Sequence, residues 1–166
     1  LTLNDANISL NGITFDVKGT LKRDTVRRAL NVDIAYALHA PSLETVFNMI
    51  PESVLKRESM EARGSVKMEG DVKGWYGKQQ MPAVTLKVQI DKASAKYDKL
   101  PYGIDNFTAD FYAFVDLMRK QPSYADLKIF HFQGAHTDIL ADAKIMNLLE
   151  DPDITFNTKS KVDLTA

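Results

Sequence analysis

The feature that most constrains this chain is an alternation of large apolar residues with a period of two. In MPAVTLKVQIDKASAKYDKLP, residues 81–101, every second residue from Val84 to Ile90 is large and apolar, and after Asp91-Lys92 the alternation resumes at the opposite parity. Side chains alternate between the two faces of a strand, so this period indicates strands with one covered face. The parity change predicts either a tight turn between two hairpin strands, which we favour, or a bulge.

The same alternation recurs along most of the chain. Its apolar sets fall in the segments 13–17, 30–38, 66–72, 84–90, 107–117, 127–132, 139–145 and 154–156. Turn-forming pairs lie between or beside these sets, at Asn11-Gly12, Asp91-Lys92, Tyr102-Gly103 and Gln133-Gly134. The sequence therefore predicts a mainly β fold for residues 1–166, a long, curled, largely antiparallel sheet with one or two short helices packed at an end.

One segment has a helical period instead. Leu43, Val46, Phe47 and Ile50 follow the i, i+3, i+4, i+7 spacing of an amphipathic helix. Ser42 is a suitable N-cap, and the proline at position 51 ends the first helix and can begin a second short turn. We expect a helix over about 41–57 that packs against one end of the sheet.

Aromatic residues are predicted on both faces of some strands. Phe111 and Tyr112 lie on opposite faces of one predicted strand. In the next predicted strand, Phe130 and Leu127 are an odd number of residues apart and are therefore predicted on opposite faces. One interpretation is burial on both sides, against the helix or a second sheet. The other is an open sheet whose apolar face is left for a ligand or partner.

Composition narrows the classes of function. The 166 residues are 45% hydrophobic and 26% charged, with a net charge of −1 and no cysteine. The absence of cysteine excludes disulfides, thiolate metal sites and a cysteine nucleophile. Lys and Arg are spread along the chain without forming a basic stripe, so we expect no nucleic-acid partner.

No catalytic, metal-binding or cofactor-binding residue is assigned from the sequence. His131 and His136 flank a predicted turn at Gly134, and Asp138 and Asp142 follow, but we interpret the histidines as polar residues of a hairpin rather than zinc ligands. Gly64, Gly70 and Gly74 are separated by strand residues and open no helix, so they predict bends or close backbone approaches rather than a phosphate loop. We expect a non-enzymatic protein.

Five phrases follow one another along nearly the whole chain. They are APSLETVFNMIP, GSVKMEGDVKGWYG, MPAVTLKVQIDKASAKYDKLPYGIDNFTADF, LKIFHFQGAHTDILADAKIMNLL and DPDITFNTKSKVDLTA. The phrase with Asp91, Ala93, Tyr97, Leu100-Pro101 and Ile104 is the most distinctive part. In this order the phrases resemble the AsmA-like family of Gram-negative envelope proteins, particularly the versions from Bacteroides-type bacteria.

The resemblance implies a role in outer-membrane biogenesis. Such proteins are anchored in the inner membrane by an N-terminal helix, lie mostly in the periplasm and form long curled sheets with an apolar groove for phospholipid. The chain begins at Leu1, and residues 31–40 weakly repeat at 157–166. We therefore expect a fragment of a larger repeat-containing periplasmic protein, with its anchor outside the fragment. The expected partners are a phospholipid or other envelope lipid and neighbouring repeats of the same chain.

The apolar sets of two adjacent predicted strands supply the candidate lipid-binding lining. These residues are Val84, Leu86, Val88, Ile90, Phe107, Phe111 and Val115. A lipid-binding role predicts that they remain uncovered. Two alternatives stay open: the same residues form a core beneath the helix, or the chain is a purely structural or protein-interaction module of the envelope, with free strand edges.

Overall fold

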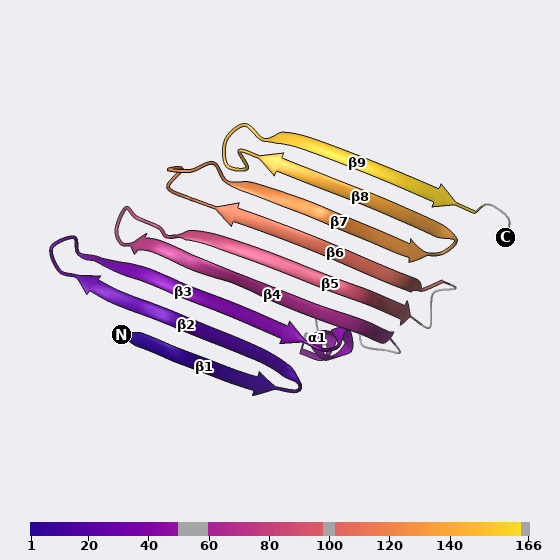
Figure 1. Ribbon diagram of the computed structural model, residues 1–166, viewed down its shortest axis with the longest axis horizontal. Coiled ribbons are helices and arrows are strands. Elements are labelled where there is room, and N and C mark those ends of the chain that lie inside the picture. Colours follow the sequence, from indigo (N-terminus) through magenta and orange to yellow (C-terminus); the bar gives the residue numbers. More distant parts are fainter. Residues whose placement is uncertain (50–59, 98–101, 164–166) are drawn as a thin grey trace.

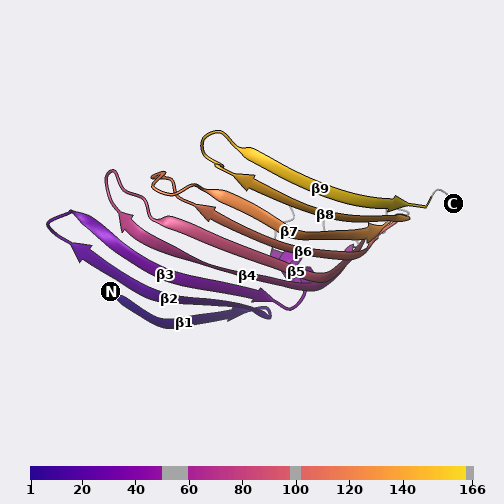
Figure 2. The ribbon, with the colours of Figure 1, turned by 45° about the horizontal axis from the view of Figure 1, so that its top comes forward.

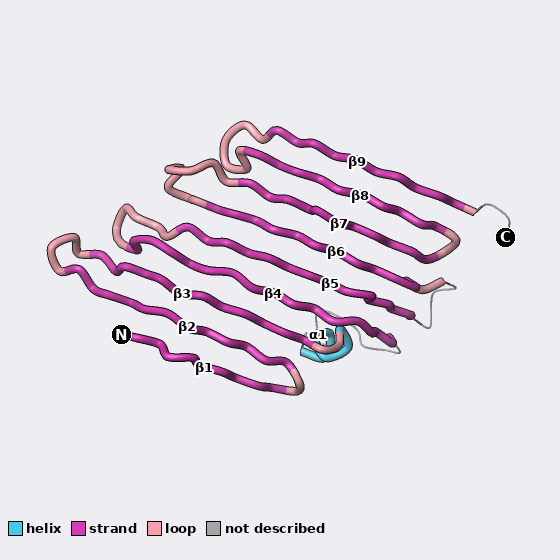
Figure 3. Tube along the Cα trace, in the orientation of Figure 1, coloured by secondary structure: helices cyan, strands magenta, loops and turns pink. Residues whose placement is uncertain are grey.

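The computed structural model describes residues 1–49, 60–97 and 102–163, and most of them lie in one antiparallel sheet (Figure 1, Figure 3). Each strand pairs with the next one in the chain, so β1 and β9 form the two edges. The strands are β1 (Thr2–Leu10), β2 (Ile13–Asp24), β3 (Ala29–Ala40), β4 (Met60–Tyr76), β5 (Ala83–Tyr97), β6 (Ile104–Val115), β7 (Tyr124–Gly134), β8 (Thr137–Met146) and β9 (Asp153–Val162). The predicted mainly β, antiparallel fold is confirmed.

The one helix of the described residues is α1 (Leu43–Met49), which contacts β3 and β4. The Glu44 backbone N–H donates a hydrogen bond to the Ser42 hydroxyl at 3.2 Å, so Ser42 caps the helix as predicted. The remainder of the helix predicted over 41–57 lies outside the described residues.

The helix end of the sheet is covered on one face. Ala40 and Ala62 are 0% and 3% exposed. Their neighbours His39, Glu61 and Arg63, which point to the other face because side chains alternate along a strand, are exposed. At this end of the sheet, the face that carries Ala40 and Ala62 is therefore shielded from solvent, and the opposite face is not.

The parity change at Asp91-Lys92 is a bulge within β5. Ile90 pairs with Ala109 and Ala93 pairs with Phe107, so two residues of β5 oppose one of β6. Lys92 has a φ of 47°. The bulge is therefore confirmed. The predicted turn at this point is wrong, because β5 continues to Tyr97 and pairs with β4 and β6 both before and after Asp91-Lys92. The bulge returns Ala93 to the face of Ile90.

A second bulge corrects the prediction for the aromatic residues of β7. Leu127 pairs with Phe111 and Phe130 pairs with Ala109, so the register shifts between Leu127 and Phe130. The extra residue places Phe130 on the face of Leu127, although the two differ in parity. The prediction that they lie on opposite faces is therefore wrong. Figure 2 shows that the strands bend, as bulged strands do.

The hairpin turns agree with the sequence at one position and are displaced at another. Asn11 and Gly12 have φ values of 51° and 82° and form the predicted two-residue turn between β1 and β2. The turn predicted at Gln133-Gly134 lies later, at Ala135 and His136, whose φ values are 49° and 61°. Gln133 and Gly134 are the last residues of β7.

Gly70 is one of two glycines in β4 where the backbone of a neighbouring strand comes close; the other is Gly64, beside Ala93. The Tyr36 hydroxyl of β3 donates to the Thr85 carbonyl oxygen of β5 at 2.7 Å. Gly70 lies between these strands as the register partner of both Tyr36 and Leu86. A Cβ at Gly70 would lie 2.1 Å from the Thr85 carbonyl oxygen and 2.5 Å from the Tyr36 hydroxyl. A side chain at this position would therefore collide with backbone.

We expect Gly70→Ala to lower the free energy of unfolding by about 2 kcal/mol, the usual size of an overpacking penalty, because the backbone of β5 must move. Urea denaturation followed by circular dichroism measures the change. Gly77→Ala is the matched control, since its Cβ would meet the Ala29 methyl group at 3.1 Å and no backbone atom closer than 3.6 Å. Equal losses in the two variants would contradict this account of Gly70.

Candidate functional site

One register row of apolar side chains crosses the whole sheet. Residues directly opposite each other in paired strands lie on the same face. Each strand from β1 to β9 contributes one residue to this row. In strand order they are Ile8, Phe15, Leu38, Met68, Val88, Phe111, Leu127, Ala143 and Phe156. We call the face that carries this row the apolar face.

A second row on the apolar face is also free of charge. It consists of Ala6, Val17, Tyr36, Gly70, Leu86, Ala113, Ala125, Ile145 and Ile154. Eight steps between neighbouring strands, each of about 4.8 Å, make these rows roughly 40 Å long. The apolar face is therefore continuous from one sheet edge to the other.

The apolar face is not covered by a second layer formed by the described residues. No large side chain among them is fully buried, and the buried apolar residues are Ile13, Val32 and five alanines. In the long row, Leu38, Met68, Val88 and Phe111 are each partly exposed. Toward the edges exposure rises, and Ile8 and Phe156 are both 61% exposed. The sheet thus leaves much of its apolar surface in contact with solvent.

The structure brings the predicted lining residues together on the apolar face. Val88 is the register partner of Phe111, Val84 of Val115, and Ala93 beyond the bulge of Phe107. All seven predicted residues are partly exposed. The contacts of α1 are mainly with β4 and β3, whereas the lining lies on β5 and β6. The rest of the helix predicted over 41–57, under which the alternative placed these residues as a core, lies outside the described residues.

Sequence reasoning restricted the lining to two strands and missed its extension over the other seven. The alternation in each strand carried the signal, since Phe15, Leu38 and Met68 belong to apolar sets of the same period. What was missing was the register, which determines whether the apolar sets of neighbouring strands meet on one face. The bulge in β7 also hid the alignment of Phe130 with Phe107, whose rings meet edge to face at 5.4 Å.

The opposite face, which we call the polar face, carries a row of mostly charged or polar side chains. The row is Asn7, Asp16, Ala37, Glu69, Lys87, Tyr112, Asp126, Lys144 and Thr155. A hollow of about 790 Å³ lies over the β1–β6 part of this row. It is also lined by Asp5, Lys18, Ala35, Asp71 and Thr85, and by Val17, Tyr36 and Gly70 of the second apolar row. The largest hollow described therefore lies mainly among polar-face residues, and none of the seven predicted lining residues borders it.

Two of the carboxylates in this hollow, those of Glu69 and Asp71, have lysine partners. The Glu69 carboxylate lies 3.7 Å from the Lys67 ammonium and 3.6 Å from that of Lys87, and the Asp71 carboxylate lies 3.9 Å from Lys73. Burial, followed by the nearby Asp71 charge, raises the pKa of the Tyr36 hydroxyl. Ion-paired carboxylates are a poor environment for a hydrocarbon chain, because charged groups lose hydration when they are covered.

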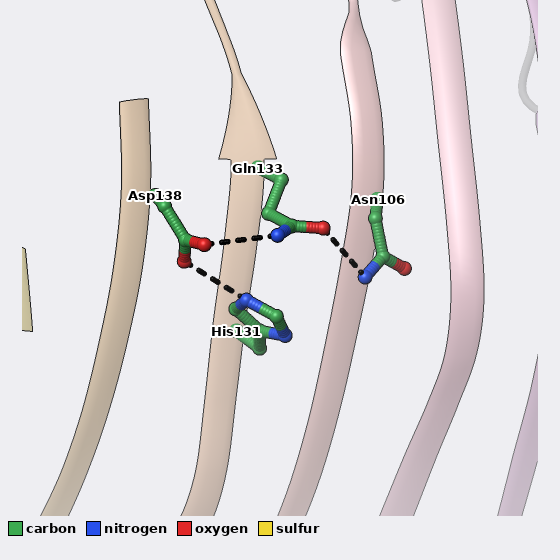
Figure 4. A network of polar contacts seen from close by, with 4 residues as sticks. All are labelled: Asn106, His131, Gln133 and Asp138. Carbon is green, nitrogen blue, oxygen red and sulfur yellow. Dashed lines mark hydrogen bonds and ion pairs between the residues drawn. The ribbon is translucent and has the colours of Figure 1, made fainter. Parts of the chain in front are cut away.

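A hydrogen-bonded network crosses three strands at the other side of the polar face (Figure 4). Asp138 of β8 accepts a hydrogen bond from the Gln133 side-chain amide of β7 at 2.9 Å, and its other oxygen lies 2.9 Å from His131 Nε2. The Asn106 side-chain N–H of β6 donates to the Gln133 side-chain oxygen Oε1 at 3.3 Å. The network joins β6, β7 and β8 through their side chains.

His136 lies apart from this network, in the turn, where its ring packs edge to face against Tyr102 at 5.4 Å. The described residues contain no group of three or more His, Asp or Glu side chains placed to hold a metal ion. His131 is instead paired with Asp138 of the neighbouring strand, and His136 takes no part in that pair.

Comparisons with known proteins add no relative, because no family model, no curated protein and no solved structure matches the chain. The similarity to AsmA-like proteins thus stays a prediction from the sequence. Among the described helices, none is long and apolar enough to cross a membrane.

Hydrogen bonds from Gln133 and then His131 lower the pKa of the Asp138 carboxyl group. A depressed pKa in the folded state means that the contribution of Asp138 to stability is present above its unfolded pKa and is lost as the pH falls through the folded value. We expect Gln133→Leu to raise the pKa of Asp138, since the largest cause of the shift is removed. Carboxyl chemical shifts followed through an acid titration measure this change.

Gln89→Leu is the control for this titration, because Gln89 lies on the polar face of β5 opposite Asp110 and belongs to no part of the network. It should leave the Asp138 titration unchanged. An unaltered Asp138 titration in Gln133→Leu would contradict the assigned hydrogen bond.

Proposed function

We propose that the chain is a non-enzymatic segment of an AsmA-like cell-envelope protein that binds the acyl chains of phospholipid along its apolar face. The observation that supports this most directly is the row from Ile8 to Phe156, which crosses nine strands without a polar side chain. The residues proposed to contact lipid first are the seven of the predicted lining on β5 and β6.

The energetics favour a hydrocarbon occupant. Covering an acyl chain gains about 0.8 kcal/mol for each CH2 group removed from water, and the exposed side chains of the apolar face gain from the same contact. The hydrocarbon core of a bilayer is about 30 Å thick, so each leaflet contributes about half of that length. Rows of roughly 40 Å can therefore accommodate an acyl chain across several strands.

The chemistry of the two faces supports the apolar face as the place for lipid. Acyl chains require a surface without charge, which the rows through Val88 and Leu86 provide. The polar face offers the ion pairs of Glu69 and Asp71 instead. No defined pocket is needed, because hydrocarbon contact is non-directional and specific hydrogen bonds would not strengthen it. Such a surface suits a periplasmic protein that holds lipid between two membranes.

A second candidate function is that of a purely structural module whose edges pair with neighbouring repeats. It is favoured by the open edges at β1 and β9, where unpaired backbone groups are available for strand addition. In that case Ile154 and Phe156, both 61% exposed, become covered by the added repeat. The apolar face then serves as a protein contact.

Native mass spectrometry after expression in the periplasm of a Gram-negative host tests the lipid proposal. We expect the chain to carry bound phospholipid and Val88→Asp to lose most of it, because the new carboxylate lies at the centre of the long row. Phe111→Asp, at the register partner of Val88, should have the same effect.

The matched control is Gln89→Asp, which places a carboxylate one residue away on the polar face. It should retain lipid at the level of the unaltered chain. Circular dichroism of all three variants establishes that the sheet is intact. Lipid-free protein from the unaltered chain, or equal lipid loss in Gln89→Asp, would reject the proposal and favour the structural module.

A further inference from the structure

One end of the sheet gathers exposed apolar and cationic side chains in its hairpin turns. Odd and even strands run in opposite directions, so the turns after β2, β4, β6 and β8 lie at the same end, and their tips follow one line in Figure 1. Figure 2 shows the same alignment from a second direction. We give the name tip surface to the first three of these turns, which are residues 25–28, 77–82 and 116–123. The fourth turn, residues 147–152, exposes the acidic residues Glu150 and Asp151 and is not part of the tip surface.

Each turn of the tip surface exposes an apolar side chain. Val26 is 93% exposed, Leu117 54% and Met81 43%. Tyr76, at the end of β4 beside the second turn, is 51% exposed. Exposed apolar side chains that recur in three successive turns are typical of a contact surface.

Positive charge accompanies these apolar residues. Every Lys and Arg in the described loops lies in the tip surface, and the set is Arg27, Arg28, Lys78, Arg119 and Lys120, all exposed. Arg27 lies over the Trp75 ring at 4.7 Å and 3.9 Å from Asp24, and Arg119 lies 3.8 Å from Glu150. Arg28, Lys78 and Lys120 make no ion pair with any described residue.

The turns are held in shape by their own hydrogen bonds. The Asp24 carboxylate accepts from the backbone N–H groups of Val26 and Arg27, both at 2.9 Å. In the third turn the buried Asp116 carboxylate accepts from the N–H groups of Met118, Lys120 and Gln121 at 2.9 to 3.0 Å. The Asp24 and Asp116 carboxylates are thereby engaged by backbone N–H groups, while the cations and apolar side chains are exposed. Such preorganised turns lose little conformational entropy on binding.

We propose that the tip surface docks on an anionic lipid bilayer. Exposed apolar side chains flanked by Lys and Arg, with an aromatic residue beside them, match the interface of such a membrane, where hydrocarbon lies beneath negatively charged headgroups. Charge complementarity selects an anionic surface over a neutral one. This docking is independent of lipid binding along the apolar face, because it uses the turns and not the rows through Val88 and Leu86.

Co-sedimentation with vesicles tests this inference. The full chain should sediment with vesicles of phosphatidylglycerol and phosphatidylcholine in equal parts, sediment more weakly with phosphatidylcholine alone, and be released by salt. Arg28→Glu combined with Lys120→Glu should lower the partition coefficient at least tenfold, since each cation near an anionic surface contributes roughly fivefold. Val26→Asp should also weaken binding, and it should leave the fold intact because Val26 is 93% exposed.

The controls match these changes elsewhere on the sheet. Lys96→Glu combined with Lys159→Glu makes the same charge change at exposed positions of β5 and β9, and Leu10→Asp places a carboxylate at a side chain 57% exposed at the other end of the sheet. These controls should sediment like the unaltered chain. Val88→Asp should also sediment with vesicles like the unaltered chain, although we expect it to lose copurified phospholipid. The two measurements therefore distinguish failure of this inference from failure of the proposed function.

Three outcomes would overturn the docking inference. They are equal binding to neutral and anionic vesicles, equal loss in the charge controls and the tip variants, and failure of the unaltered chain to sediment with vesicles at low salt. The last outcome would redirect the tip surface to an acidic protein as its partner.

Discussion

The pairing register of the nine strands is the constraint on which the rest of this structure depends. Side chains alternate along each strand, so a slip of one residue between two strands would exchange the apolar and the polar face beyond that point. The bulges in β5 and β7 show how sensitive the arrangement is. Each adds one residue where the parity of the apolar set changes, and so Ala93 and Phe130 remain on the apolar face.

A single layer of strands satisfies the backbone but not the apolar side chains. Interior strands have a hydrogen-bonded neighbour on both sides, whereas the apolar face has cover from the described residues only near α1. Ala40 and Ala62 are buried there, and the large side chains farther along the face are only partly buried. Apolar surface of this extent is rarely left unused in a soluble protein. A hydrocarbon ligand is the occupant that we propose, and a further repeat is the alternative.

The sheet separates three kinds of surface by simple geometry. Alternation along the strands divides apolar from charged side chains between two faces, and the hairpin turns form a third surface at the strand ends. The hollow on the polar face is lined by paired charges such as Glu69 and Lys87, and the network around Asp138 joins strands on the same face. Lipid binding on the apolar face and membrane docking at the tip surface therefore need not compete for the same residues.

The sequence by itself determined the period of two, the N-cap at Ser42 and the turn at Asn11-Gly12, because each depends on residues close together in the chain. It also placed Val88 and Phe111 in apolar sets. It did not determine whether Asp91-Lys92 turned the chain or bulged one strand, nor that Phe130 and Leu127 share a face. Those outcomes depend on which residue of a neighbouring strand stands opposite. Only the tertiary structure decided this register, and with it the continuity of the apolar face, since hydrogen bonds between strands join residues that are distant in sequence.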